Sequence, residues 1–137
     1  MKKVRIATGA GFAADRIEPG VELVKKGNID YLIYECLAER TIAIAQKEKL
    51  VNPNKGYNSM LEDRLNAVID DCVTKNIRII TNMGAANPIG AMEKTKELLR
   101  GKGYKGLKVA VVLGDDVLDT LKNYESDIRL LESDKTL

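Results

Sequence analysis

The sequence contains no histidine and only two cysteines in 137 residues. Without histidine, Ser-His and Cys-His nucleophile pairs and histidine-liganded zinc sites are excluded. Any general acid or base must therefore be Asp, Glu, Lys, Tyr or Cys. The two cysteines, Cys36 and Cys72, fall inside predicted helices. We interpret them as free thiols of a reducing cytoplasm rather than as a disulfide.

The sequence also lacks long apolar runs and blocks of one charge. No apolar run approaches the roughly 20 residues that cross a bilayer, and Arg5 and Gly9 interrupt the only apolar stretch that a signal peptide could use. The 22 basic and 20 acidic residues are spread along the chain. Neither a basic block nor an aromatic platform indicates nucleic-acid binding. We expect a single cytoplasmic domain that binds neither nucleic acid nor membrane.

The stretch 77–90, IRIITNMGAANPIG, carries the clearest structural pattern. Its β-branched apolar residues predict a buried strand, and a loop with one glycine and two asparagines follows. Asn87 is suited to cap a helix and Pro88 to occupy its first position. In open α/β sheets, such strand-to-helix loops build ligand sites outside the carboxyl ends of the strands.

Apolar stretches alternate with helical patterns along the chain. We predict strands over residues 4–8, 30–34, 77–80 and 107–113. We predict helices over residues 21–26, 35–49, 59–72, 88–100 and 117–122. The third of these helices would begin with a capping box of Ser59 and Glu62. The alternation predicts an α/β domain over residues 1–123, followed by a tail over 124–137. Its sheet would be doubly wound and mainly parallel, Rossmann-like or flavodoxin-like, with about four strands flanked by helices.

Glycine and polar residues follow the end of each predicted strand, so we expect them to converge on one edge of the sheet. The predicted ligand-binding residues are Gly9, Gly11, Arg16, Glu39, Asn82, Gly84, Asn87, Gly114 and Asp116. Glu35 and Asp115 are the predicted proton-transfer groups. Asn82 and Asn87 would polarise a ligand carbonyl, with backbone N–H groups near Gly84 as further donors.

Each of these residues also has a purely structural interpretation. Loops after strands use glycine to turn and Asn or Asp to cap helices, and for Asn87 and Asp115 capping alone explains the residue type at least as well. Glu35 and Glu39 would share one helix face near its N-terminus, where the helix dipole favours negative charge. The adjacent carboxylates of Asp115 and Asp116 do not by themselves specify a metal site, and we predict none.

The spacing of Gly9, Gly11 and Ala14 resembles a dinucleotide-binding loop, with Glu35 as the ribose ligand. That loop requires a helix that starts at the second glycine. Here Pro19 and its neighbours interrupt the region, so any helix begins late. The sequence therefore does not predict which cofactor, if any, the protein binds.

Five stretches taken together resemble the N-terminal part of the acyclic terpene utilisation AtuA family. They are GAGFAADR at 9–16, GNIDYLIYECLAERT at 27–41, KGYN at 55–58, TNMGAANP at 81–88 and VVLGDD at 111–116. The resemblance implies a role in the breakdown of acyclic terpenes such as citronellol and geraniol, through CoA-thioester intermediates. It places family loop residues on Gly9, Gly11, Leu37, Ala38, Glu39, Asn82, Gly84, Asn87 and Pro88. The sequence departs from the family pattern at Ala85 and Ala86, where glycine is expected.

Family members continue well beyond residue 137, so the resemblance implies that this chain corresponds to their first portion. We expect a small-ligand-binding domain of an enzyme subunit that acts on an acyl-CoA or an organic acid. The alternative is a non-catalytic binding or assembly subunit, completed by a partner chain that carries the rest of the fold. Because an isolated sheet has edge strands to protect, we also expect a homo-oligomer or hetero-oligomer.

Overall fold

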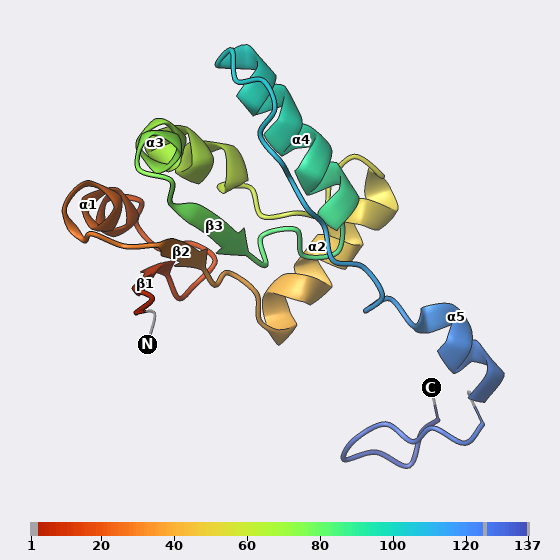
Figure 1. Cartoon of the computed structure of the whole chain (residues 1–137). Coiled ribbons are helices and arrows are strands. Elements are labelled where there is room, and N and C mark those ends of the chain that lie inside the picture. Colours follow the sequence, from red (N-terminus) through yellow and green to blue (C-terminus); the bar gives the residue numbers. More distant parts are fainter. Residues whose placement is uncertain (1–2, 125, 137) are drawn as a thin grey trace.

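The computed structural model describes residues 3–124 and 126–136. Three strands alternate with helices in the first hundred residues, and a short helical segment follows near the C-terminus (Figure 1). The elements are β1 (Ile6–Ala10), α1 (Glu18–Lys26), β2 (Tyr31–Tyr34), α2 (Glu39–Val51), α3 (Leu61–Thr74), β3 (Arg78–Thr81), α4 (Pro88–Gly101), α5 (Leu118–Leu121) and a 3-10 turn (Lys122–Tyr124).

The sheet has the order β1-β2-β3, and both pairings are parallel. Each new strand is added on the same side of the previous one, β2 beside β1 and β3 beside β2. Because such connections are right-handed, the helices of successive crossovers lie on one face of the sheet. Accordingly, α1 packs against β1 and α3. The α/β class and the parallel sheet with flanking helices are confirmed, and the described residues form three strands rather than about four. Helices on both faces would need a reversal of strand order, and the described residues show none.

The core lies between this sheet face and the helices. Leu32 and Tyr34 of β2 are completely buried, and an apolar stripe on α3 belongs to the same core cluster. The spacing of Leu61, Leu65, Val68, Ile69 and Cys72 predicts this stripe; Ile69 is half-buried and the other four are buried. Fully burying one large aliphatic side chain stabilises a fold by about 1.5–3 kcal/mol. The stripe is therefore the main attachment of α3 to the sheet.

The predicted start of α4 is confirmed. The Oδ1 atom of Asn87 accepts a hydrogen bond from the backbone N–H of Gly90 at 3.0 Å, and Pro88 occupies the first helical position. The predicted capping box of α3 is wrong. The helix begins at Leu61, and the preceding turn is closed by Asn58, whose Oδ1 accepts from the backbone N–H of Met60 at 2.9 Å.

The predicted helix from residue 35 begins only at Glu39, so Glu35 and Cys36 lie between β2 and the helix. The cause is a long-range contact, because the backbone N–H of Cys36 donates to Oδ1 of Asn82 at 2.7 Å. This bond extends the contact between β2 and β3 beyond their last paired residues. The predictions that Cys36 lies in a helix and that Glu35 shares a helix face with Glu39 are therefore wrong.

The predicted fourth strand over residues 107–113 is also wrong. This segment is extended, but no backbone hydrogen bond joins it to another described residue. Val112 is 91% exposed. Apolar, β-branched residues favour extended backbone. A β-strand, however, also needs a neighbouring strand with which it can form hydrogen bonds. The described part of the chain supplies no such neighbour.

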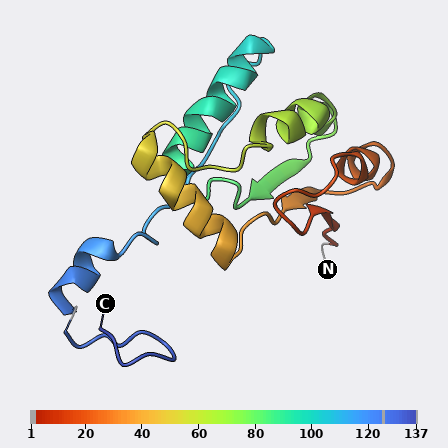
Figure 2. The same ribbon diagram turned by 180° about the vertical axis from the view of Figure 1, so that it is seen from behind.

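Beyond residue 113 the chain leaves the α/β body and extends past α2 (Figures 1 and 2). We call the described residues 114–124 and 126–136 the C-terminal arm. It contains α5 and an isolated antiparallel bridge between Arg129 and Thr136. Among the described residues, no helix is both long and apolar enough to cross a membrane.

Candidate functional site

The carboxyl ends of the three parallel strands lie at one edge of the sheet, and the loops that follow them form a rim. Most of the sequence-predicted site residues are distributed over three parts of this rim, whereas Glu39, the first residue of α2, and Gly84, in the loop before α4, line neither pocket. One part is a pocket after β1, the second is a hydrogen-bonded pair between β2 and β3, and the third is a pocket beside α2 and α4.

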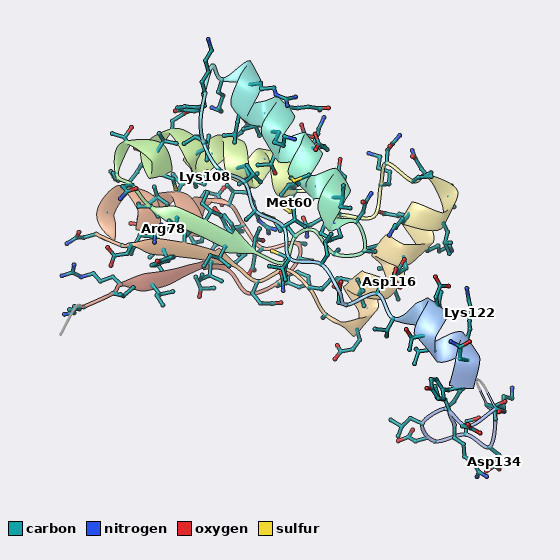
Figure 3. All side chains as sticks on the ribbon, turned by 45° about the vertical axis from the view of Figure 1, so that its right-hand side comes forward. Met60, Arg78, Lys108, Asp116, Lys122 and Asp134 are labelled. Atoms are coloured by element: carbon teal, nitrogen blue, oxygen red, sulfur yellow. The ribbon has the colours of Figure 1, made fainter. Side chains whose placement is uncertain are left out.

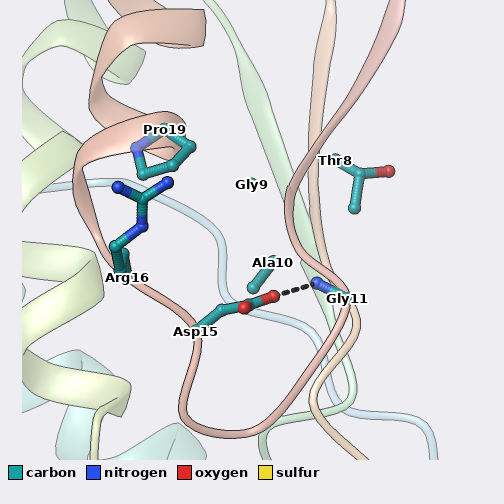
Figure 4. A pocket seen from close by; sticks show the side chains of 7 residues that line it. All are labelled: Thr8, Gly9, Ala10, Gly11, Asp15, Arg16 and Pro19. Carbon is teal, nitrogen blue, oxygen red and sulfur yellow. Dashed lines mark hydrogen bonds between the residues drawn. The ribbon is translucent and has the colours of Figure 1, made fainter.

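The first pocket has a volume of about 170 Å³ and lies after β1 (Figure 4). It brings together the predicted residues Gly9, Gly11 and Arg16. The Oδ2 atom of Asp15 accepts a hydrogen bond from the backbone N–H of Gly11 at 2.8 Å. A carboxylate of the protein therefore already uses the donor that a ligand phosphate would need.

The dinucleotide arrangement is not formed at this pocket. Helix α1 begins at Glu18, well after Gly11. Gly9 has a packing reason of its own, because an added Cβ would lie 2.7 Å from Cε1 of Tyr34. Gly20, at the start of α1, makes room for the hydroxyl of the same tyrosine. These two glycines allow α1 and β1 to close over the Tyr34 ring.

Glu35 and Asn82 form the second part of the rim. The Nδ2 atom of Asn82 donates to Oε1 of Glu35 at 2.8 Å, and the backbone N–H of Leu37 donates to the same oxygen at 3.1 Å. The hydrogen bond from Asn82, followed by that from Leu37, holds the pKa of Glu35 below its usual value. An exposed carboxylate with a lowered pKa is ionised and weakly basic near neutral pH. The main role of this pair is therefore to connect the end of β2 to the end of β3.

The second pocket has a volume of about 290 Å³ and lies between α2, the loop from β3 to α4, and residues 113–116. It brings together the predicted residues Asn87, Gly114, Asp115 and Asp116. The other lining residues are Ile42, Gln46, Lys49, Ala85, Ala86, Pro88, Ile89 and Leu113. Three aliphatic side chains thus lie beside an ammonium group and two carboxylates.

Asn87 holds the wall of this pocket. Besides capping α4, its Nδ2 donates to the carbonyl oxygens of Pro53 and Lys55 at 2.9 and 2.8 Å. The Nζ atom of Lys49 donates to the carbonyl oxygen of Ala86 at 2.8 Å. Together these bonds fix the loop that follows α2 against the loop that precedes α4. The amide of Asn87 is therefore engaged by the protein itself.

At Ala85, where the family pattern has glycine, the backbone keeps the conformation that glycine would favour. Ala85 has φ +45°, in the left-handed region, where an alanine is strained. Gly84 precedes it, and an added Cβ there would lie 2.8 Å from Cα of Pro88. The loop thus approaches the start of α4 closely at Gly84 and turns at Ala85.

Sequence reasoning missed Arg64, which is completely buried beneath the rim. Its Nη1 donates to the carbonyl oxygen of Ala13 at 3.1 Å and its Nη2 to that of Asp15 at 2.9 Å. Nη1 also lies 3.0 Å from Sγ of Cys36 and 3.8 Å from Sδ of Met83. One guanidinium therefore joins the loops after β1, β2 and β3.

A signal for Arg64 exists in the sequence. It lies three residues after Leu61 and four before Val68, on the apolar face of α3. A charged residue at a core position of an amphipathic helix indicates an internal polar partner, because an unpartnered buried charge is very costly. Within the described residues, no cluster of three acidic or cysteine side chains is suited to hold a metal ion.

Comparison with known proteins gives one match. The family model described as acyclic terpene utilisation family protein AtuA matches residues 4–137. Searches of curated proteins and of solved structures found no match to the chain. The family match covers the β1 loop, the Glu35–Asn82 pair, the second pocket and the arm. The chain belongs to the acyclic terpene utilisation family AtuA.

Proposed function

We propose that this chain binds the acyl end of a CoA thioester in the pocket between α2 and α4, as part of an enzyme of acyclic terpenoid or organic-acid breakdown. One observation carries the proposal. Residues from three separate parts of the chain, 42–49, 85–89 and 113–116, line a single cavity beside the carboxyl rim of the sheet. Cavities at this edge of parallel sheets are the usual ligand sites of α/β proteins.

The lining favours a ligand with an apolar chain and a neutral polar group. Ile42, Ile89 and Leu113 offer aliphatic contacts. Asp115 and Asp116 on the polar side disfavour a free carboxylate, whereas a thioester carbonyl carries no charge. The volume of about 290 Å³ is near the lower end of the roughly 300–1,000 Å³ typical of ligand pockets. A short or partly inserted acyl group fits that space, with the CoA part outside.

Asp115 is our proposed proton-transfer group, because it lines the cavity. Glu35 is a weaker candidate than sequence reasoning suggested, since Asn82 and the backbone already hydrogen-bond its carboxylate. A group that shuttles protons near neutral pH needs a pKa near that range, and the pKa of Glu35 is lowered.

A second function, non-catalytic binding or assembly, is favoured by a different observation. The arm and the preceding segment expose large apolar side chains, including Val112, Leu113 and Leu131. Such exposure on a soluble chain marks interaction surfaces. In this alternative the chain contributes its pocket to an assembly whose catalytic groups lie on a partner chain.

The test is calorimetric titration of the full chain with geranoyl-CoA, compared with free CoA and with geranic acid. We expect binding of the thioester and much weaker binding of the other two. Ile89→Asp places a charge in the apolar wall and should weaken thioester binding about tenfold or more. Leu50→Asp, at an 85% exposed position at the end of α2, is the control and should leave binding unchanged. Absence of thioester binding, or equal effects of both variants, would contradict the proposal.

Measurement of turnover distinguishes the enzymatic function from the non-catalytic assembly function. If Asp115 transfers a proton, Asp115→Asn should retain thioester binding and lose turnover of the assembled system. Asp134→Asn, the same change in the exposed part of the arm, is the matched control. If turnover survives Asp115→Asn, the assembly role is favoured and the proton-transfer assignment is wrong.

A further inference from the structure

The face of the sheet opposite the helices is uncovered and largely apolar. Register places six side chains on it, in the rows Ile6–Tyr31–Arg78 and Thr8–Ile33–Ile80. Alternate residues of a strand point to opposite faces, and Leu32 and Tyr34 of β2 point into the core. Ile6 is 66% exposed and Ile80 is 53% exposed. We call these six residues the open face.

The C-terminal arm exposes a second apolar surface. Val117 and Leu118 at the start of α5 are 48% and 57% exposed, Tyr124 is 55% exposed and Leu131 is 93% exposed. No hydrogen bond joins the arm to the α/β body among the described residues. Exposed apolar groups on a projecting segment lose the stabilisation that burial would give them. The arm therefore has the composition of a docking segment.

The charges of the two parts are complementary. Residues 114–137 contain seven acidic and three basic residues, whereas residues 1–113 contain 13 acidic and 19 basic residues. The only charged side chain on the open face is that of Arg78, which donates to the Tyr31 hydroxyl at 2.7 Å and lies over its ring. An acidic arm is therefore attracted to a basic body.

The position of the arm favours docking between two chains. Figures 1 and 2 both show α2 between the strands and α5. Figure 3 shows Lys122 and Asp134 far along the arm, on the side of the molecule away from Arg78. Residues 113–116, at the base of the arm, line the pocket beside α2 and α4, so the arm starts at the carboxyl end of the sheet. To reach its own open face it would have to reverse direction around α2.

We propose that this protein is a dimer in which the arm of each chain docks on the open face of a second copy. The exchange is reciprocal, so both arms and both open faces are used and the assembly closes with two-fold symmetry. The apolar residues of α5 pack on Ile6, Ile33 and Ile80, and the acidic residues of the arm lie near Arg78 and the basic body. This inference is independent of the proposed ligand.

The first experiment is sedimentation velocity of the full chain over a range of concentrations. We expect a dimer that weakens as salt is raised, since screening reduces the attraction between arm and body. Ile80→Glu places a charge on the open face, and Leu118→Asp places one on the arm. Each should raise the dimer dissociation constant about tenfold or more. Leu50→Glu, outside both surfaces, is the control and should not change it.

Circular dichroism checks that each variant is folded, and cross-linking of the unmodified protein gives a test that needs no substitution. Equal amounts of ¹⁴N- and ¹⁵N-labelled chains are mixed and joined with a carbodiimide, which couples carboxylates to lysines. Peptides that join the arm to the body should carry mixed labels. A monomer at all concentrations, cross-links within single chains only, or a dimer unaffected by Ile80→Glu and Leu118→Asp would overturn the proposal.

Discussion

The guanidinium of Arg64 and the thiol of Cys36 meet inside the protein, with Nη1 3.0 Å from Sγ and both side chains buried. Among the described residues, no carboxylate hydrogen-bonds to Arg64. Its charge is instead balanced by the carbonyl dipoles of Ala13 and Asp15 and by the ring of Tyr34, whose centroid lies 5.8 Å from Cζ. The rim is thus assembled around a buried cation.

Removal of Arg64 should be strongly destabilising. Arg64→Ala leaves the carbonyl oxygen of Asp15 without its donor, leaves that of Ala13 with only the bond from Nδ2 of Asn58, and creates a cavity. We expect a loss of about 3 kcal/mol or more in the free energy of unfolding. Arg64→Met fills the space without the hydrogen bonds and should lose less. Urea unfolding measures both. Arg100→Ala, an exposed change in α4, is the control and should lie within about 0.5 kcal/mol of the unmodified protein. An Arg64→Ala loss as small as that of the control would contradict this role.

The two thiols should be unreactive in the folded protein. Burial raises the pKa of Cys36, with Arg64 acting in the opposite direction, and burial raises the pKa of Cys72 to about 11. The reactive thiolate is therefore scarce at pH 8. We expect slow reaction with Ellman's reagent in buffer and rapid reaction of both thiols in guanidinium chloride. Rapid modification of the native protein would show that the strand-end loops open readily.

Asn87 should contribute more than a helix cap. Asn87→Ala loses the cap and two donated hydrogen bonds, and we expect a loss of about 2–3 kcal/mol in urea unfolding. Asn87→Asp keeps the capping acceptor but loses the donors to Pro53 and Lys55, so it should also be destabilised. Asn54→Ala, at an exposed loop position, is the matched control. A stability of Asn87→Asp equal to that of the unmodified protein would mean that the cap alone matters.

Glu35 should make stability depend on acid pH. Its pKa is lowered in the folded state by Asn82 and then by Leu37, so the folded state favours the ionised form. The resulting stabilisation is present above the unfolded pKa, about 4.5, and is lost as the pH falls through the lower folded value. Thermal unfolding between pH 3 and 6 should show a smaller pH dependence for Glu35→Gln than for the unmodified protein. Asn82→Ala should reduce the dependence in the same way, because it removes the main cause of the shift.

Tyr34 should make stability depend on alkaline pH. Burial is the main cause that raises its pKa from 10.0 to about 12, so between these values the folded state retains a proton that the unfolded state has lost. Stability should therefore fall as the pH rises from about 10 to about 12. Tyr34→Phe removes this contribution, and since the Tyr34 hydroxyl is buried without a hydrogen-bond partner among the described residues, it should cost little at pH 7. An unchanged alkaline profile in Tyr34→Phe would assign the effect to other groups.

The order of helices and parallel strands, the buried stripe of α3 and the start of α4 at Asn87 and Pro88 were determined by the sequence itself. Each depends on local preference or on a period of apolar residues, and both are visible along the chain. The location of polar loops at the strand ends was predictable for the same reason. The family was also recognisable from the loops, because their order and spacing are properties of the sequence.

Only the tertiary structure decided which of these groups meet. Asn82 engages Glu35 and Cys36 across two strands, and this contact delays the start of α2 and lowers the pKa of Glu35. Residues 107–113 have the sequence of a strand but no paired neighbour among the described residues. Arg64 stands on the apolar face of α3, but its partners Ala13, Asp15 and Cys36 lie far away along the chain. Pairing, burial and charge balance depend on atoms far apart along the chain, and local sequence preferences do not contain that information.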